Sequence, residues 1–203
     1  MDIITMISSL QLSYGYVAKP LAGEAESGDQ WLIKETPNYV LVAVADGLGH
    51  GPHAAEAAKQ AICVLNTHIP DMTLIELMNE CHMQLQGTRG IALTLIKIQP
   101  HYQVDWLGVG NVIGTHWQDM HSNLKTEGLF TQGGVVGYQI PPLHVSQLTT
   151  GPGHTLIIAT DGLDDHFTIA QPIYKPAQVI ADELFKKYHN VHDDALILVI
   201  HWE

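Results

Sequence analysis

The segment that most constrains the fold runs from Val40 to Gly51 and reads VLVAVADGLGHG. Its first six residues are all apolar, which is typical of a strand covered on both faces. Asp46 is the first charge and stands where this strand leaves the core. Glycines at positions 47, 49 and 51 remove side chains around the carboxylate, so backbone atoms can approach whatever it binds. Asp-Gly is also a strong hairpin signal, and the segment alone leaves a turn and a binding site equally open.

The composition favours a globular, acidic protein. The 203 residues are 46% apolar, which is enough for a sizeable core, and we expect one domain over residues 1–203. Lysine and arginine number 9 against 21 acidic residues, and the net charge of -12 argues against nucleic acid as a partner. An acidic protein can instead collect cations or meet a basic protein surface.

The sequence carries no signal for secretion or membrane insertion. The N-terminus, MDIITMISSLQL, lacks the basic region and the long apolar stretch of a signal peptide. No apolar run reaches the roughly 20 residues that span a membrane. Cys63 and Cys81 fall in predicted helices, and we expect two buried, reduced side chains rather than a disulfide. We therefore expect a cytoplasmic protein without a membrane contact, and a monomer.

Apolar periodicity and turn signals predict the order of the elements. Pro52 suits the first position of a helix that continues to His68, and Thr73 opens a second helix with a capping-box pattern. A third helix is expected within Pro176–Tyr188. Many strands and grouped helices predict an α+β fold, and the first three strands, separated only by turns, predict a meander. The predicted strands are Met6–Ala18, Trp31–Ile33, Val40–Ala45, Arg89–Ile98, His101–Gly108, Val112–Trp117, Leu124–Phe130, Leu143–Leu148, Thr155–Thr160 and Ala195–Trp202.

Four acidic positions share one context, at the ends of predicted strands. Asp46 and Asp161 each close an apolar strand and precede a glycine. Asp29 opens a strand, and Asp193-Asp194 comes directly before the last one. Antiparallel neighbours bring the end of one strand beside the start of the next, so these carboxylates can converge. Any one of them alone could equally be a turn or cap residue.

Converging carboxylates repel each other unless a cation lies between them. Hard divalent cations such as Mg²⁺ and Mn²⁺ prefer carboxylate, carbonyl and water oxygens. Two such ions ~3.5–4 Å apart suit in-line attack on a phosphorus atom. Four aspartates in the same context therefore favour a metal site over four separate turns.

Four motifs together resemble those of a known enzyme family. They are SGD at Ser27–Asp29, ADGLGHG at Ala45–Gly51, TDGL at Thr160–Leu163 and DDAL at Asp193–Leu196. In this order they resemble the metal-dependent PPM-type protein serine/threonine phosphatases, and the ADG-x-G-HG form resembles their SpoIIE-like branch. The chain length, the segment RGIALTLIKI and the segment GVGNV are most similar to the small stressosome phosphatases of that branch.

The resemblance implies a four-layer α-β-β-α sandwich, in which helix pairs flank two stacked antiparallel sheets. Asp46 would bridge two Mn²⁺ or Mg²⁺ ions, and the carbonyl oxygen of Gly47 would bind one of them. Asp161 and Asp193 would complete the ligand shells, and Asp29 would bind a metal directly or through water. A metal-bound hydroxide would attack the phosphorus of phosphoserine or phosphothreonine without a phosphoenzyme. The implied substrate is a phosphorylated STAS-domain protein of the stressosome.

The chain departs from the family pattern at two places. The last motif usually reads Asp-Asp-x-Thr, and Leu196 stands where the threonine is expected. No arginine precedes Asp29 where larger relatives carry a phosphate-binding one, and Lys19, the nearest cation, is expected to be a solvated loop residue. The resemblance therefore implies weaker phosphate binding rather than an inactive enzyme. No segment for a flap subdomain is evident, which implies an open site.

Three other polar residues each allow two interpretations. His50 lies in the glycine turn beside Asp46 and could donate a proton to the leaving serine oxygen, against a loop histidine that packs locally. Arg89 is expected to form the turn before a strand, with a phosphate contact as the minority alternative. Asn111 is expected in a turn, where it could also shape the rim of the site. The 13 histidines contain no zinc-site spacing.

Two hypotheses from different classes follow. The first is a metal-dependent phosphoprotein phosphatase with Asp46 and Asp161 at its centre. The second is a catalytically decayed module of the same fold that docks a regulatory partner. Retention of every expected carboxylate favours the enzyme. Titration with Mn²⁺ separates the two, because a decayed site should bind the cation weakly or not at all. A nucleotide phosphohydrolase is a distant third.

Overall fold

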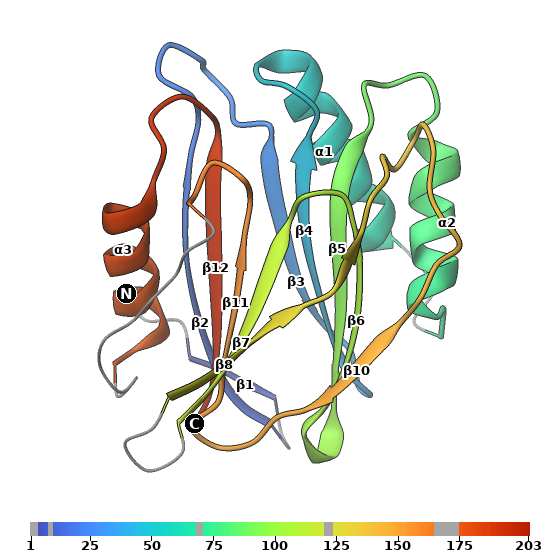
Figure 1. Ribbon diagram of the computed structural model, residues 1–203. Coiled ribbons are helices and arrows are strands. Elements are labelled where there is room, and N and C mark those ends of the chain that lie inside the picture. Colours follow the sequence, from blue (N-terminus) through green and yellow to red (C-terminus); the bar gives the residue numbers. More distant parts are fainter. Residues whose placement is uncertain (1–3, 8–9, 68–70, 120–123, 165–174) are drawn as a thin grey trace.

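The computed structural model describes residues 4–7, 10–67, 71–119, 124–164 and 175–203, and two stacked sheets dominate it (Figure 1). Strands pair antiparallel throughout, except that β9 runs parallel to β6. Sheet A consists, in spatial order, of β1 (Ile4–Ile7), β2 (Leu10–Lys19), β12 (Ala195–Trp202), β11 (Thr155–Ala159), β7 (Ile113–Asp119) and β8 (Leu124–Leu129). Sheet B consists of β10 (Ser146–Thr149), β6 (Gln103–Val109), β5 (Ile91–Gln99), β4 (Val40–Gly47) and β3 (Asp29–Glu35), with β9 (Thr131–Gln132) beside β6.

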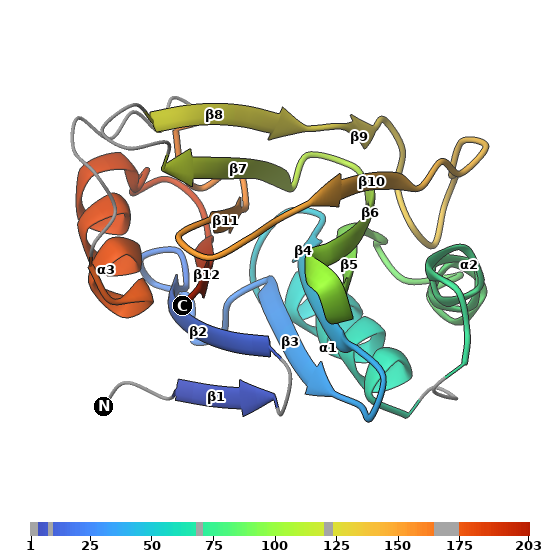
Figure 2. The ribbon, with the colours of Figure 1, turned by 90° about the horizontal axis from the view of Figure 1, so that it is seen from below.

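Helices cover the outer faces of both sheets. Helices α1 (Pro52–Thr67) and α2 (Leu74–Gln84) pack on sheet B, and α3 (Ala177–Tyr188) packs on sheet A (Figures 1 and 2). A short turn of 3₁₀ helix, Pro100–Tyr102, joins β5 to β6. In the described part of the chain, no helix is long and apolar enough to cross a membrane.

The predicted α+β sandwich of two sheets is confirmed, and so is the helix pair on sheet B. On sheet A the structure describes one helix, α3. Residues 165–174, where the sequence predicts mixed helix and loop, lie outside the described residues. The capping box at the start of α2 is present: Glu76 N donates to Thr73 Oγ1 at 3.2 Å, and Thr73 N donates to Glu76 Oε2 at 2.7 Å.

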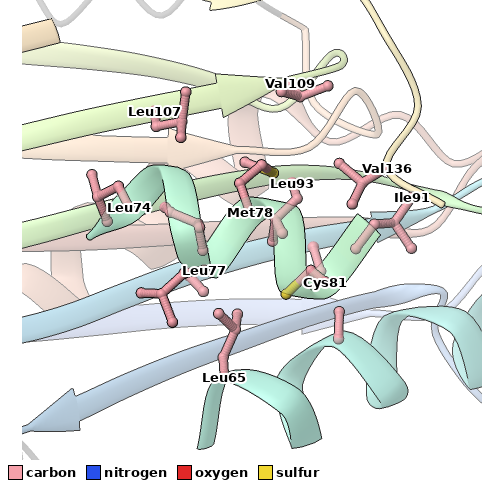
Figure 3. Packing of buried hydrophobic residues seen from close by; sticks show 14 of the residues in the cluster. Leu65, Leu74, Leu77, Met78, Cys81, Ile91, Leu93, Leu107, Val109 and Val136 are labelled. Carbon is pink, nitrogen blue, oxygen red and sulfur yellow. The ribbon is translucent and has the colours of Figure 1, made fainter. Parts of the chain in front are cut away.

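Strand β4 shows why its sequence is apolar without interruption. Leu41, Ala43 and Ala45 face the cluster beneath α1 and α2, while Val40, Val42 and Val44 face the cluster between the two sheets. Both faces are therefore covered, as predicted, and each buried valine or leucine side chain contributes roughly 1.5–3 kcal/mol. Figure 3 shows the first cluster, in which Leu65 of α1 and Met78 and Cys81 of α2 pack toward sheet B.

The meander predicted for the first three strands is wrong. Strand β2 lies in sheet A between β1 and β12, whereas β3 and β4 lie in sheet B. The segment over residues 20–28 crosses from one sheet to the other, and Asp194 holds it by accepting hydrogen bonds from Leu21 N and Gly28 N. Strand periodicity carries no information about such a crossover. The single strand predicted over Met6–Ala18 is also divided into β1 and β2, which pair with each other.

The prediction that both cysteines are buried is half correct. Cys81, a residue of α2, is fully buried, but Cys63, a residue of α1, is exposed. The buried face of α1 consists of alanines and Leu65, and Cys63 falls outside that stripe. Position within an amphipathic helix, rather than residue type, decides its exposure.

The pair His116 and His154 should make stability depend on pH. His116 is buried, its Nε2 lies 3.0 Å from Nδ1 of His154, and burial first, then His154, lowers the pKa of His116 from 6.5 to about 4. Between these values the unfolded chain binds the extra proton, so the contribution of His116 to stability should fall as pH drops from 6.5 toward 4, by up to about 1.4 kcal/mol per pH unit. Urea unfolding at pH 7, 6 and 5 measures this contribution as the difference in free energy of unfolding between the wild type and His116→Asn, which should become less favourable to the wild type as pH falls. Equal slopes would contradict the assignment.

Candidate active site

The four predicted carboxylate positions meet at one end of the two sheets, the upper end in Figure 1. Strand β3 begins at Asp29 and β4 ends just after Asp46, and the two residues are paired directly across the ladder. Asp161 comes two residues after the end of β11, and Asp193 two residues before the start of β12. Because β11 and β12 are antiparallel neighbours, this end of sheet A is shared by both segments. The site therefore lies where the two sheets meet.

A buried threonine connects the two sheets at this point. The Oγ1 of Thr160 donates to Oδ2 of Asp29 at 2.8 Å and accepts from Leu196 N at 2.9 Å. Asp29 is only 3% exposed, and Thr160 is fully buried. Thr160 thus fixes the orientation of the Asp29 carboxylate. No role was predicted for this threonine from the sequence, although it stands directly before the Asp-Gly pair in the TDGL motif.

The carboxylates raise each other's affinity for protons. Burial, and then the charge of Asp46, raises the pKa of Asp29 to about 8. Burial, and then the charge of Asp161, raises the pKa of Asp46 to about 7. The pKa of Asp193 is also raised, by burial first and by Asp161 and Asp194 as further charges. Carboxylates in this arrangement are costly to ionise together unless a cation compensates for them.

The donor set fits a hard divalent cation. None of the four carboxylates makes an ion pair with a lysine or arginine of the described residues, so no cationic side chain in that part of the chain neutralises them. All candidate ligands are oxygens, the type that Mg²⁺ and Mn²⁺ prefer. No three His, Cys, Asp or Glu side chains in the described ranges close around a single point. Water and backbone carbonyl oxygens must therefore supply part of the shell, as is usual for Mg²⁺.

The two aspartates before β12 have different surroundings. Asp194 is 4% exposed, and its two carboxylate oxygens accept from Leu21 N at 2.8 Å and Gly28 N at 2.9 Å. Both carboxylate oxygens of Asp194 are therefore used to hold the backbone segment that leads into Asp29. Asp193 is half-buried, and its Oδ1 accepts from Asp194 N at 2.8 Å. Of the two, Asp193 keeps more of its carboxylate for a ligand.

Asn111 belongs to the site, although the sequence analysis favoured a turn role for it. Its Nδ2 donates to Oδ2 of Asp161 at 2.6 Å, and its amide also lowers the pKa of Asp46 through a hydrogen bond. Asn111 follows β6 in the GVGNV segment, where the chain passes from sheet B to sheet A. An amide that serves both carboxylates can orient them without adding charge.

His50 lies at the rim and not among the carboxylates. Its Nδ1 lies 2.9 Å from Oε1 of Glu24, and both side chains are partly exposed. His50 is close enough to Asp193 to lower the pKa of that carboxyl if charged. Glu24, which orients the ring, was missed by the sequence analysis because its loop carries no periodic signal.

The glycines after Asp46 and Asp161 are required by close packing. A Cβ on Gly47 would lie 2.2 Å from the carbonyl oxygen of Ala54 in α1, and a Cβ on Gly162 would lie 1.9 Å from the carbonyl oxygen of Asp194. Both positions thus bring another backbone segment against the site. This packing is a physical reason for the Asp-Gly pairs, in addition to the predicted coordination by the Gly47 carbonyl.

One known protein family matches most of this chain. The family described as Stage II sporulation protein E (SpoIIE) matches residues 36–203. The chain belongs to the SpoIIE family. Asp46, Asp161 and Asp193 lie inside the matched span, and Asp29 precedes it. The SpoIIE-like resemblance drawn from the four motifs is thereby confirmed.

The predicted similarity to the stressosome phosphatase RsbX is also confirmed. The phosphoserine phosphatase RsbX of Bacillus subtilis (strain 168) is 30% identical over 91 residues, which make up 44% of this chain and 45% of RsbX. That alignment thus spans less than half of the relative. A solved chain from the bacterial stressosome superposes with a TM-score of 0.84 at 26% identity, over 94% of this chain and 99% of its own.

Two further solved structures share the fold and hold metal ions. RsbX in complex with magnesium superposes with a TM-score of 0.83 at 19% identity, over 100% of both chains. The catalytic domain of the serine/threonine protein phosphatase PstP, in complex with 2 manganese ions, superposes with a TM-score of 0.66 at 14% identity, over 94% of this chain and 97% of its own. These two structurally similar proteins therefore bind magnesium and manganese, respectively.

The different surroundings of Asp193 and Asp194 give a paired prediction. Asp194→Asn should lower the free energy of unfolding by ~1–3 kcal/mol, because one of its two backbone donors would then face an amide N–H. Asp193→Asn should leave stability unchanged or raise it, since it keeps its acceptor oxygen and removes a repelling charge. Urea unfolding without divalent cations measures both. An equal loss in the two variants would show that Asp194 has no special structural role.

Proposed function

We propose that this chain is a metal-dependent protein phosphatase that removes phosphate from phosphoserine or phosphothreonine in a signalling protein. The observation that carries the proposal is the convergence of carboxylates from both sheets, of which Asp29 is buried and Asp46 and Asp193 are half-buried, without a lysine or arginine partner in the described ranges. Structural groups of this kind are normally paired. Membership of the SpoIIE family supports the same reaction.

In this proposal Asp46, Asp161 and Asp193 hold the metal ions, with Asp29 as a direct or water-mediated ligand and Gly47 as a carbonyl ligand. We propose two Mn²⁺ or Mg²⁺ ions, the ions found in the solved relatives. When bound, such ions polarise phosphoryl oxygens and lower the pKa of water, which makes hydrolysis possible at neutral pH.

Other residues of the chain keep the ligands in place. Thr160 orients Asp29, Asn111 orients Asp161, and Asp194 fixes the backbone before Asp29. Outer hydrogen bonds of this kind commonly matter nearly as much as the ligands themselves. Leu196, at the position of the expected threonine, has its side chain fully buried between the sheets. Only its backbone contacts Thr160: its N–H donates to Thr160 Oγ1 at 2.9 Å, and its carbonyl oxygen accepts from Thr160 N at 3.0 Å. The departure at Leu196 therefore leaves the site intact.

The substrate that we propose is a phosphorylated STAS-domain protein of a stressosome. The relative RsbX is named a phosphoserine phosphatase, and another similar chain comes from the bacterial stressosome. Asp161, Asn111 and His50 are exposed, so the site is open to a phosphoserine on the surface of a folded protein. The rival hypothesis, a decayed docking module, has no observation in its favour, because every predicted carboxylate is present at the site.

The central test removes one proposed ligand at a time. Asp46→Asn and Asp161→Asn should each lower Mn²⁺ affinity and phosphate release by more than about 100-fold, because even an outer-shell partner is worth roughly 10–100-fold. Mn²⁺ affinity is measured by calorimetry, and phosphate release on a phosphorylated STAS protein and on p-nitrophenyl phosphate. Asp182→Asn, an exposed aspartate on α3, is the control and should behave as the wild type. A wild type that binds Mn²⁺ but hydrolyses neither substrate would overturn the proposal.

We propose His50 as the proton donor to the leaving serine oxygen, held by Glu24 at 2.9 Å. His50→Gln should lower kcat for a phosphoserine peptide on the order of 100-fold, the contribution of a general acid. It should leave p-nitrophenyl phosphate nearly unaffected, because a nitrophenolate leaves without a proton. Glu24→Gln should reproduce part of the effect. Equal losses on both substrates would assign His50 to the structure of the rim instead.

A further inference from the structure

We infer that Arg89 binds the phosphoryl group of the substrate and takes the place of the arginine that is missing before Asp29. The inference rests on the proposed function and adds a substrate-binding residue to it. Arg89 is the single arginine of the chain, which otherwise carries its positive charge on lysines. Its location, its anchoring and its lack of a partner each support this role.

Arg89 lies next to the strand pair that carries Asp46. Arg89 precedes β5, which pairs with β4 so that Ile91 lies opposite Gly47 and Ala92 opposite Asp46. Leu48 N donates to Gly90 O at 3.1 Å, which ties the Arg89-Gly90 turn to the glycine turn that follows Asp46. The arginine therefore stands two residues outside the strand pair that carries Asp46.

Hydrogen bonds and close packing fix the backbone on both sides of Arg89. The Thr88 hydroxyl donates to Leu85 O at 2.7 Å and accepts from Gly90 N at 3.1 Å. Gly90 has a φ of +80°, and a Cβ there would lie 2.5 Å from Cγ1 of Val135, so the turn is packed from the other side as well. The fixed backbone therefore holds the base of the Arg89 side chain in a defined place beside the glycine turn.

The guanidinium of Arg89 contacts the glycine turn that follows Asp46. Its Nη1 lies 3.5 Å from the carbonyl oxygen of His50 and within 3.1 Å of the place where a Cβ on Gly49 would be. The group therefore lies over the glycine turn beside the carboxylate site. This long contact is its only hydrogen bond in the described part of the chain, and the residue is exposed. Most of its five N–H donors remain available to a ligand.

The missing partner is informative because a carboxylate is close by. Glu24 lies against the same turn, where a Cβ on Gly51 would be 3.0 Å from its Oε2. Glu24 binds His50 instead, and Arg89 forms no ion pair with any described residue. In a chain of net charge -12, an exposed arginine at an acidic site that makes no ion pair is placed for an external anion.

Two lysines on the surrounding segments already have partners. The Lys19 ammonium lies 5.3 Å from the ring centroid of Phe185, over α3, and Lys59 is paired with Glu26 at 2.7 Å. Lys19 was the nearest cation in the sequence, but its contact directs it away from the carboxylates. A guanidinium can grip two phosphoryl oxygens at once, which a lysine ammonium cannot do. The phosphoryl group of phosphoserine or phosphothreonine is the anion that the proposed reaction brings to this place.

The test compares Arg89→Ala and Arg89→Lys with a matched loss of charge elsewhere. The control is Lys34→Ala, because Lys34 donates to Asn66 O at 2.6 Å near the end of β3 opposite Asp29. Inorganic phosphate is titrated into the Mg²⁺-loaded protein and followed by phosphorus NMR, and kcat/KM is measured on a phosphoserine peptide. Calorimetry with Mn²⁺ and thermal unfolding show whether the metal site and the fold are unchanged.

Arg89→Ala should weaken phosphate binding and lower kcat/KM by roughly 10- to 100-fold, the usual worth of a charged hydrogen-bond pair. Arg89→Lys should recover part of the loss, and Lys34→Ala should match the wild type. Mn²⁺ affinity and thermal stability should be unchanged in all three. If Arg89→Ala binds phosphate and turns over substrate like Lys34→Ala, the inference is wrong while the proposed function stands. If the wild type has no turnover, the proposed function is wrong, and the phosphate titration alone then decides the role of Arg89.

Discussion

The structure depends on the way in which the two sheets are joined at their carboxylate end. The Thr160 hydroxyl donates to Asp29 across the sheet interface, and Asp194 holds the crossing segment that leads into Asp29. These bonds bring like charges together, which electrostatics alone would separate. The resulting site is costly when its carboxylates are ionised without a compensating cation. The proposed metal ions would remove this cost, which links the fold to the proposed function.

The cost of this arrangement is offset elsewhere in the molecule. Apolar clusters lie on both sides of each sheet, and β4 contributes side chains to two of them. Its last residues, Asp46 and Gly47, can thus be held rigidly at the edge of a well-packed core. Functional sites commonly store such local cost on a scaffold that is stable without them. Close backbone packing at Gly47 and Gly162 adds to this rigidity, since no larger residue fits there.

The charged side chains at the centre of the site and those at its rim differ in how they are paired. Among the aspartates at the centre, Asp29 is buried, Asp46 and Asp193 are half-buried, and Asp161 is exposed. None of them makes an ion pair with lysine or arginine in the described ranges, whereas Glu24 at the rim pairs with His50. Arg89 comes to the same rim from the start of β5 and contributes a charge that forms no ion pair with any residue the structure describes. In the proposed enzyme the centre would hold metal, and the rim would recognise the phosphorylated residue. The two tasks would then be carried by different parts of the chain, so variants can separate them.

The sequence by itself determined much of this picture. Uninterrupted apolar strands ending in Asp-Gly, the helix caps and the order of four motifs were enough for the fold class, the family and the candidate ligands, because these signals are local. It did not determine that β2 and β3 lie in different sheets, that Cys63 is exposed, or that Thr160, Asn111 and Glu24 orient the site residues. Each of these depends on contacts between segments far apart in the chain. Only the tertiary structure brings such segments together, since periodicity records which face of an element is buried but not what covers it.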